Sequence, residues 1–264
     1  MKFSRKQLNI PYVIFLVGFV LLPLLVVLYY ALMNGRGQFT WDNFYAFFSN
    51  SKTMGTLLYS FLIAVATTIG CLLIAYPTAY ILARGPFKHG GVLMVLLVMP
   101  MWINFTLRIT AVKEILSLIE GNLAMYPFFN TVLCMIYDFL PFMILPLYTT
   151  IIKLDKSLPE AAADLGADKW HIFWRVMLPL TLPGIVSGVT MVLLPSMTNY
   201  VVLDMVYNST YIMGSLIGSY FNTYDWHNGS MISIILLVII FGLTWLTEHF
   251  SGKQGAETRG GGIW

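Results

Sequence analysis

Six long apolar stretches divide this chain, and they constrain its fold more than any other feature of the sequence. A helix rises about 1.5 Å per residue, so about 20 apolar residues cross the hydrocarbon core of a bilayer. Inside that core every backbone N–H and C=O needs a partner within the protein, and a helix supplies these partners itself. We therefore expect an all-α integral membrane protein with six transmembrane helices, at Ile10–Met33, Thr56–Ala83, Gly91–Ala111, Phe128–Ile152, Pro183–Leu203 and Ser230–Phe250.

The composition excludes a water-soluble protein. Only 10% of the residues are charged and 58% are hydrophobic, whereas soluble domains carry about 25% charged residues. The net charge of +3 is too small to indicate a nucleic-acid partner. Cys71 and Cys134 both fall inside apolar stretches, which favours buried thiols over a disulfide framework. The first apolar stretch is longer than the core of a signal peptide and no cleavage site follows it, so we expect it to remain as a membrane helix.

The positive charges predict how the chain is oriented, because Lys and Arg accumulate on the cytoplasmic side of membrane proteins. One set of loops and ends is rich in them: Lys2, Arg5, Lys6, Arg84, Lys88, Lys153, Lys156, Lys169, Arg175, Lys253 and Arg259. The opposite set has only Arg36, Lys52, Arg108 and Lys113. Both termini and the segment 153–182 are therefore expected on the cytoplasmic side. The transmembrane domain is expected to cover residues 1–250, followed by a Gly-rich, flexible cytoplasmic tail over 251–264.

The most charged part of the chain is Ser157–Pro179, between the fourth and fifth apolar stretches. Its opening predicts a helix, because Ser157 is a good N-cap and Glu160 three residues later completes a capping box. Gly166 permits a turn, and Asp168 can cap a second, short helix that ends near Pro179. The sequence therefore predicts a helix–turn–helix hairpin on the charged side of the membrane.

This hairpin also carries a family resemblance. Glu160-Ala161-Ala162, Gly166, Val176 and Leu178-Pro179 resemble the EAA loop of bacterial ABC-importer permeases, with Val176 as the one departure from the usual Ile. The resemblance implies a type I ABC importer permease fold in which a cytoplasmic ATPase docks on Glu160, Ala161, Ala162, Gly166, Leu178 and Pro179. ATP would bind to that partner, because this chain has no Walker A pattern and is expected to bind no cofactor itself. The segment Trp170–Trp174 would anchor the hairpin against the membrane helices.

Longer runs point to one branch of that family. Met99–Ser117, Leu140–Ala167 and Leu178–Gly188 resemble the B-type permeases of spermidine/putrescine importers. The resemblance implies a place in the bacterial plasma (inner) membrane, in contact with membrane lipid. The implied partners are a sister permease in a heterodimer, two copies of the ATPase, an extracellular or periplasmic polyamine-binding protein and the polyamine itself.

A polyamine carries several ammonium groups, so its pathway needs carboxylates or aromatic faces to offset desolvation. Acids inside a membrane are costly and are therefore candidates for function. The candidate pathway residues are Trp102, Asp138, Tyr200 and Asp204. Each has a structural alternative: Asp138 can pair with Arg108, Asp204 can be a solvated helix-end acid, and the aromatic residues can be interfacial. For Arg108 we expect a side chain that snorkels outward, because this costs less than a buried pair.

Three other functions stay open on the sequence. The same architecture could carry an amino acid, an inorganic anion or iron, although an anion pathway predicts Lys or Arg in place of the acids. A secondary transporter or channel would leave the hairpin without a role. A membrane enzyme is disfavoured, because no catalytic residues or metal site can be recognised. The four histidines are scattered without metal-ligand spacing, at His89, His171, His227 and His249.

Overall fold

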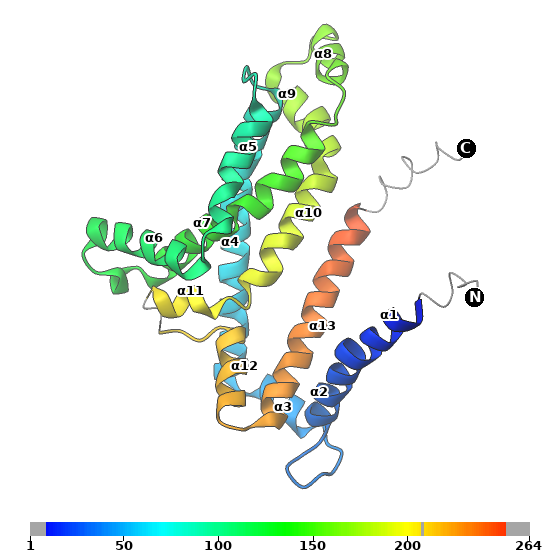
Figure 1. The fold of residues 1–264 in the computed structure, drawn as a ribbon, viewed down its shortest axis with the longest axis vertical. Coiled ribbons are helices and arrows are strands. Elements are labelled where there is room, and N and C mark those ends of the chain that lie inside the picture. Colours follow the sequence, from blue (N-terminus) through cyan, green and yellow to red (C-terminus); the bar gives the residue numbers. More distant parts are fainter. Residues whose placement is uncertain (1–8, 207–208, 252–264) are drawn as a thin grey trace. The chain divides into compact units, whose positions relative to one another are not determined.

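The computed structural model describes residues 9–206 and 209–251, and its regular elements there are all helices (Figure 1). In chain order they are α1 (Asn9–Leu16), the π-helical turn η1 (Val17–Leu21), α2 (Leu22–Leu32), α3 (Asp42–Ser49), α4 (Ser51–Arg84), α5 (Gly90–Val98), the 3-10 turn η2 (Met99–Trp102), α6 (Phe105–Glu120), the 3-10 turn η3 (Leu123–Met125), α7 (Pro127–Ile151), α8 (Ser157–Asp164), α9 (Lys169–Ile172), the π-helical turn η4 (Phe173–Met177), α10 (Leu178–Ser196), α11 (Tyr200–Met205), α12 (Met213–Asn222) and α13 (Trp226–Ser251). The predicted tail lies outside the described residues, apart from Ser251 at the end of α13.

The expected all-α membrane architecture is confirmed. Within the described residues, five continuous helical stretches are long and apolar enough to cross a membrane: Pro11–Leu32, Ser51–Arg84, Pro127–Ile151, Lys169–Ser196 and Trp226–Trp245. A sixth span is reached only if Gly90–Trp102 and Phe105–Glu120 are taken together, and these two are bent by 98°. The number of spans therefore follows the hydropathy, but the third span is broken.

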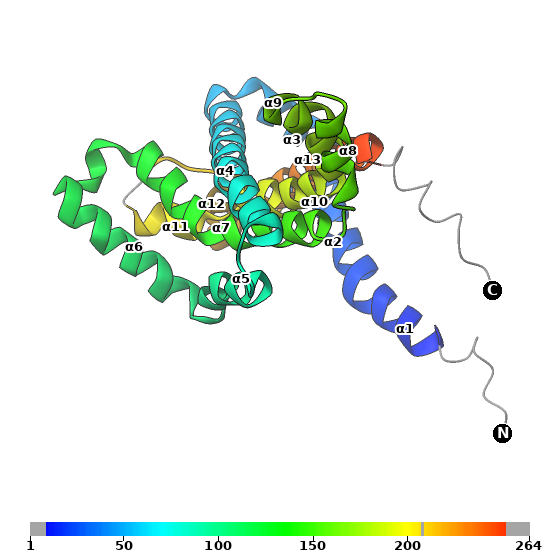
Figure 2. The same ribbon diagram turned by 90° about the horizontal axis from the view of Figure 1, so that it is seen from above.

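This break is the main departure from the predicted helices. The sequence predicts one helix over Gly91–Ala111, whereas α6 runs across the direction of α5 (Figures 1 and 2). Pro100 lacks an N–H, and Asn104 caps a new helix. The Asn104 side chain accepts hydrogen bonds from the N–H groups of Thr106 at 2.9 Å and Leu107 at 3.4 Å. The predicted end of this span at Ala111 is also wrong, because α6 continues to Glu120.

The fifth span is also displaced from its prediction. The sequence predicts a helix over Pro183–Leu203, but the helix begins far earlier, at Lys169, and ends at Ser196. A short break follows, and α11 starts at Tyr200.

The described chain divides into two compact units. The first comprises residues 9–58 and 211–241, and the second comprises 59–206, 209–210 and 242–251. In the first unit, the Asn43 side chain donates to the carbonyl groups of Ala31 at 3.3 Å and Met33 at 3.2 Å, which ties α3 to the end of α2. In the described part of the chain, the 18-residue apolar window within Pro11–Leu32 has no buried residue, whereas Ala31 near the end of α2 is buried.

The second unit is built on the pairing of α7 with α10. Gly188 makes this close approach possible, because a Cβ atom there would lie 2.6 Å from the sulfur of Met143. Gly70 does the same for α4, since its Cβ would meet the side chain of Ile136 on α7 at 2.3 Å. Cys71 and Cys134 are buried and free, as the sequence predicts.

Candidate functional site

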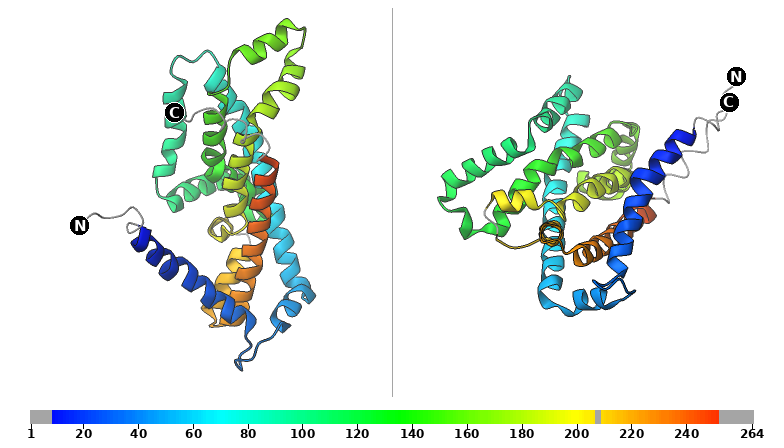
Figure 3. Two further views of the ribbon diagram at one scale, coloured as in Figure 1. Left: turned by 90° about the vertical axis from the view of Figure 1, so that its right-hand side faces the viewer. Right: turned by 60° about the horizontal axis from the view of Figure 1, so that its bottom comes forward.

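The predicted hairpin is present at one end of the second unit, where α8 and α9 project beyond α7 (Figures 1 and 3). Its turn explains the spacing of the motif. The Ala167 N–H donates to the Ala162 carbonyl at 3.1 Å and the Gly166 N–H to the Ala163 carbonyl at 2.9 Å, which is a Schellman helix end. Gly166 has a φ of +85°, a left-handed conformation that favours glycine. The second alanine and the glycine of the motif are therefore two fixed positions of one helix terminus.

The predicted capping box at the start of α8 is wrong. Ser157 is the first helical residue, and the cap position falls on Lys156, which makes no side-chain cap. The Ser157 N–H instead donates to the Asp155 carboxylate at 3.0 Å. This hydrogen bond lowers the pKa of Asp155 below its usual value. Glu160 is thus not used as a cap partner and its side chain is exposed.

The second helix of the hairpin begins as predicted but does not end near Pro179. Asp168 caps it, accepting the His171 N–H at 2.8 Å, and this hydrogen bond lowers the pKa of Asp168. The helix then continues through η4 into α10, because the Leu178 N–H donates to the carbonyl of Phe173 across a π-helical turn. Pro179, which has no N–H, follows this wide turn directly. The second helix of the hairpin and the fifth span are consequently one continuous helical rod, Lys169–Ser196.

The motif residues surround an exposed tip. Glu160, Ala161 and Gly166 are exposed, whereas Ala162, Leu178 and Pro179 are half-buried. Next to Gly166, the side chain of Leu165 is 89% exposed. The tip of the hairpin thus leaves a carboxylate and an apolar side chain open to contact with another protein.

Within the predicted anchor Trp170–Trp174, Phe173 makes the contact with α4. Its ring meets the Tyr76 ring edge to face, with centroids 5.4 Å apart. The Tyr76 hydroxyl lies 3.1 Å from the Thr181 hydroxyl, which adds a second link between α4 and the rod. Trp170 and Trp174 are exposed and contact Phe173 within the same helix.

Arg84 is a further link that sequence reasoning missed. Its guanidinium donates to the Ile151 carbonyl at 3.1 Å and also to the Leu154 carbonyl. These carbonyl groups lie where α7 ends and the hairpin begins, so Arg84 fixes the base of the hairpin to α4. The only sequence signal was a basic residue after an apolar helix, and the positive-inside rule already accounted for that.

The candidate pathway residues fall into two different environments. Asp138 is buried on α7, and Arg108 on α6 lies against it with Nη2 and Oδ1 2.8 Å apart. The expectation that Arg108 snorkels outward is therefore wrong. Its guanidinium offsets the charge of Asp138. This is the pairing that the sequence offered as the structural alternative to a pathway role for Asp138.

The other three candidates are exposed. Trp102 ends η2 at the bend and is 81% exposed. Tyr200 and Asp204 lie on α11, which packs against α6 and α7. Of the two candidate carboxylates, Asp204 is thus the one that is open to a ligand. Its helix, α11, lies beside α6 and α7, which hold the buried ion pair.

Comparisons with known proteins agree with this geometry. The family described as binding-protein-dependent transport system inner membrane component matches residues 7–254. Among curated proteins, the spermidine/putrescine transport system permease protein PotB of Haemophilus influenzae is 38% identical, covering 85% of this chain and 86% of the relative. The protein of the same name from Escherichia coli K12 is 35% identical, covering 85% and 90%. That from Salmonella typhimurium SL1344 is also 35% identical, covering 91% and 92%.

Solved structures show the same fold. A chain of a bacterial alginate ABC transporter, in complex with an alginate pentasaccharide-bound periplasmic protein, superposes with a TM-score of 0.73 over 93% of both chains at 14% identity. Another structure of a bacterial ABC transporter for alginate import gives 0.70 over 94% of this chain. From the match along nearly its whole length and from the projecting hairpin, the chain belongs to the family of binding-protein-dependent transport system inner membrane components.

Proposed function

We propose that this chain is the permease subunit of an ATP-driven importer of polyamines such as spermidine and putrescine. The observation that carries the substrate class is the similarity, at 35–38% identity over most of both chains, to permeases named for spermidine/putrescine transport. The chain would form half of the pathway beside a sister permease, with both termini and the hairpin on the cytoplasmic side of the inner membrane. A periplasmic or extracellular binding protein would deliver the substrate.

Two copies of a cytoplasmic ATPase would bind the ATP and drive the transport cycle. One copy would dock on the hairpin of each permease. The exposed tip around Glu160 and Leu165 supports this docking role. Because Lys169–Ser196 is one helical stretch, a displacement of the hairpin would tilt the fifth span directly. Arg84 and the Tyr76–Phe173 contact would pass the same displacement to α4. Alternating access then follows from rigid elements and needs no chemistry in this chain.

The test is uptake of labelled spermidine into proteoliposomes that hold the complete complex, with ATP inside and binding protein outside. Putrescine, an amino acid and sulfate are added as competitors in parallel. We expect uptake to require ATP. Among the three competitors, only putrescine should reduce it. Competition by the amino acid or sulfate would reject the substrate class, and uptake that follows an ion gradient without ATP would reject the importer.

Asp204→Asn should raise the KM for spermidine by up to about fivefold while kcat stays the same. The carboxylate is exposed, and a solvent-exposed ion pair contributes at most ~1 kcal/mol. The difference from wild type should shrink at high salt because exposed charges are screened. Glu114→Gln, which removes another exposed acid in the second half of α6, is the matched control. An unchanged KM in Asp204→Asn would remove this residue from the pathway.

A further inference from the structure

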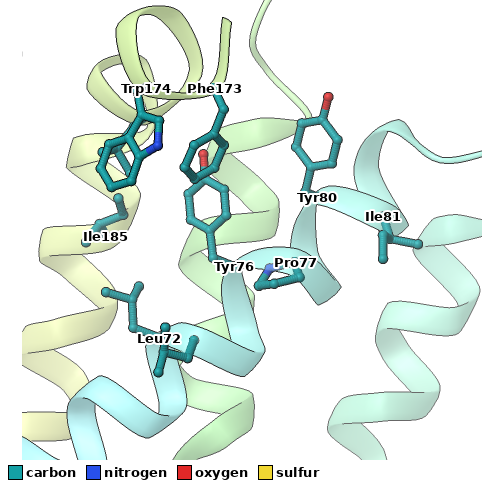
Figure 4. Close-up of a pocket in the computed structure, with 10 residues that line it drawn as sticks. Leu72, Tyr76, Pro77, Tyr80, Ile81, Phe173, Trp174 and Ile185 are labelled. Atoms are coloured by element: carbon teal, nitrogen blue, oxygen red, sulfur yellow. The ribbon is translucent and has the colours of Figure 1, made fainter. Parts of the chain in front are cut away.

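A deep apolar groove lies beside the hairpin, between α4 and the helical rod of the fifth span. It has a volume of about 440 Å³, which falls within the range of about 300–1,000 Å³ seen for small-molecule sites. Trp174 and Ile185 lie on one side and Tyr80 and Ile81 on the other, with Tyr76 between them (Figure 4). All of these residues belong to the second unit.

The lining favours a hydrocarbon chain over the transported cation as the occupant. The side chains are aliphatic or aromatic, with no acid or amide among them. The Tyr76 hydroxyl is already 3.1 Å from the Thr181 hydroxyl. An ammonium group would meet aromatic faces but no carboxylate to offset its desolvation, whereas a hydrocarbon chain gains by burial against the whole lining.

A second hollow of about 380 Å³ adjoins this groove and shares Tyr80 and Phe173 with it. Lys169 and Pro159 line the second hollow, which therefore reaches the first turn of α8. In the described part of the chain, Lys169 has no carboxylate within salt-bridge distance. Tyr80 and Trp174 are exposed, and in membrane proteins Tyr and Trp gather where lipid headgroups begin. The apolar groove thus adjoins a cation that has no carboxylate partner.

We propose that this double hollow binds one anionic phospholipid of the cytoplasmic leaflet, with an acyl chain in the groove and its phosphate group on Lys169. Each Lys or Arg close to the membrane surface attracts anionic lipid headgroups. The inference rests on the proposed function only for the side of the membrane on which the hairpin lies. The bound lipid would fill the space under the coupling hairpin, so the hairpin would rest on lipid as well as on protein.

The experiment uses the complete transporter in nanodiscs containing phosphatidylglycerol or phosphatidylcholine with a photoreactive group on the acyl chain. Labelled peptides are mapped by mass spectrometry. We expect phosphatidylglycerol to label peptides covering 72–81 and 173–185, and phosphatidylcholine to label them much less. Lys169→Gln should weaken phosphatidylglycerol labelling about fivefold, and Leu73→Trp, which fills the groove, should abolish it. Lys153→Gln and Ile69→Trp, at exposed positions that do not line the hollows, should change nothing.

Equal labelling by the two lipids, or full labelling in Lys169→Gln, would overturn the proposal. Crosslinking of Leu73→Cys to the sister permease by a thiol-reactive bifunctional reagent would also overturn it, because a protein would then cover the groove. Since labelling needs neither ATP nor substrate, failure of the lipid site is distinguishable from failure of the importer assignment.

Discussion

Arg108→Met should destabilise the protein by about 3–5 kcal/mol, the usual cost of leaving one member of a buried ion pair without its partner. Nη2 of Arg108 and Oδ1 of Asp138 are 2.8 Å apart, and the two side chains are only 9% and 6% exposed. Without the guanidinium, the carboxylate stays buried between α6 and α7 with no counter-charge. The effect is measured by heating the purified permease complex in detergent and recording how much of it stays monodisperse at each temperature.

The double variant Arg108→Met with Asp138→Leu separates the charge from the packing. Apolar residues of similar volume in place of a buried pair are neutral or stabilising by about 1–4 kcal/mol, so the double variant should be at least as stable as wild type. A single variant as stable as wild type would contradict the buried pair. Spermidine uptake by the double variant decides the role of Asp138: normal uptake makes the pair structural, and a stable protein without uptake makes Asp138 a pathway residue.

Gly166→Pro should abolish ATP-dependent uptake while the chain remains inserted in the membrane. The native φ is +85° and the N–H donates to the Ala163 carbonyl, and proline permits neither. A penalty of about 3 kcal/mol would depopulate the folded turn by roughly two orders of magnitude. Uptake in proteoliposomes, together with co-purification of the ATPase, measures coupling and docking separately.

Gly121→Pro is the matched control. Gly121 also has a positive φ, +72°, and its N–H also donates at a helix end, to the Ser117 carbonyl at 2.9 Å. The backbone lesion is the same, but it lies at the end of α6 and not in the hairpin. We expect this variant to retain the ATPase. Normal uptake in Gly166→Pro, or equal loss of the ATPase in both variants, would contradict the docking role of the hairpin.

Much of the fold follows from local sequence, because each prediction that is confirmed depends on residues close together in the chain. Hydropathy places the spans, and Gly166 and Asp168 define the turn and the second cap of the hairpin. The break in the third span had a local signal as well, since Pro100 lies just before it and Asn104 lies within it. A hydropathy window averages over these residues and therefore predicts one continuous helix across them.

Two of the misses, at Arg108 and Arg84, arise because the partner lies far away in the sequence, whereas the one at Pro179 is local. Snorkelling of Arg108 was favoured because nothing in the sequence shows that α6 and α7 bring Asp138 within 2.8 Å of it. Arg84 bonds to carbonyl groups of a different helix, so helix-end rules applied to its own helix do not reveal the contact. At Pro179 the rule that proline ends a helix failed. Pro179 has no N–H to donate, but the π-helical turn just before it, closed by the Leu178 N–H, lets the helix continue.

The bend after Trp102 shortens the distance that a cation must travel out of water. In the proposed orientation α5 and η2 start at the cytoplasmic face and, as one helix of Gly90–Trp102, rise about 20 Å, whereas the hydrocarbon core measures about 30 Å. Irregular backbone at that depth is tolerated where protein covers it or where water reaches it. If water reaches this bend, the outer part of the span would border an aqueous vestibule, and α11, which carries Asp204 and packs against α6, would lie at its wall. A hydrated polyamine would lose its water only over the inner part of the bilayer.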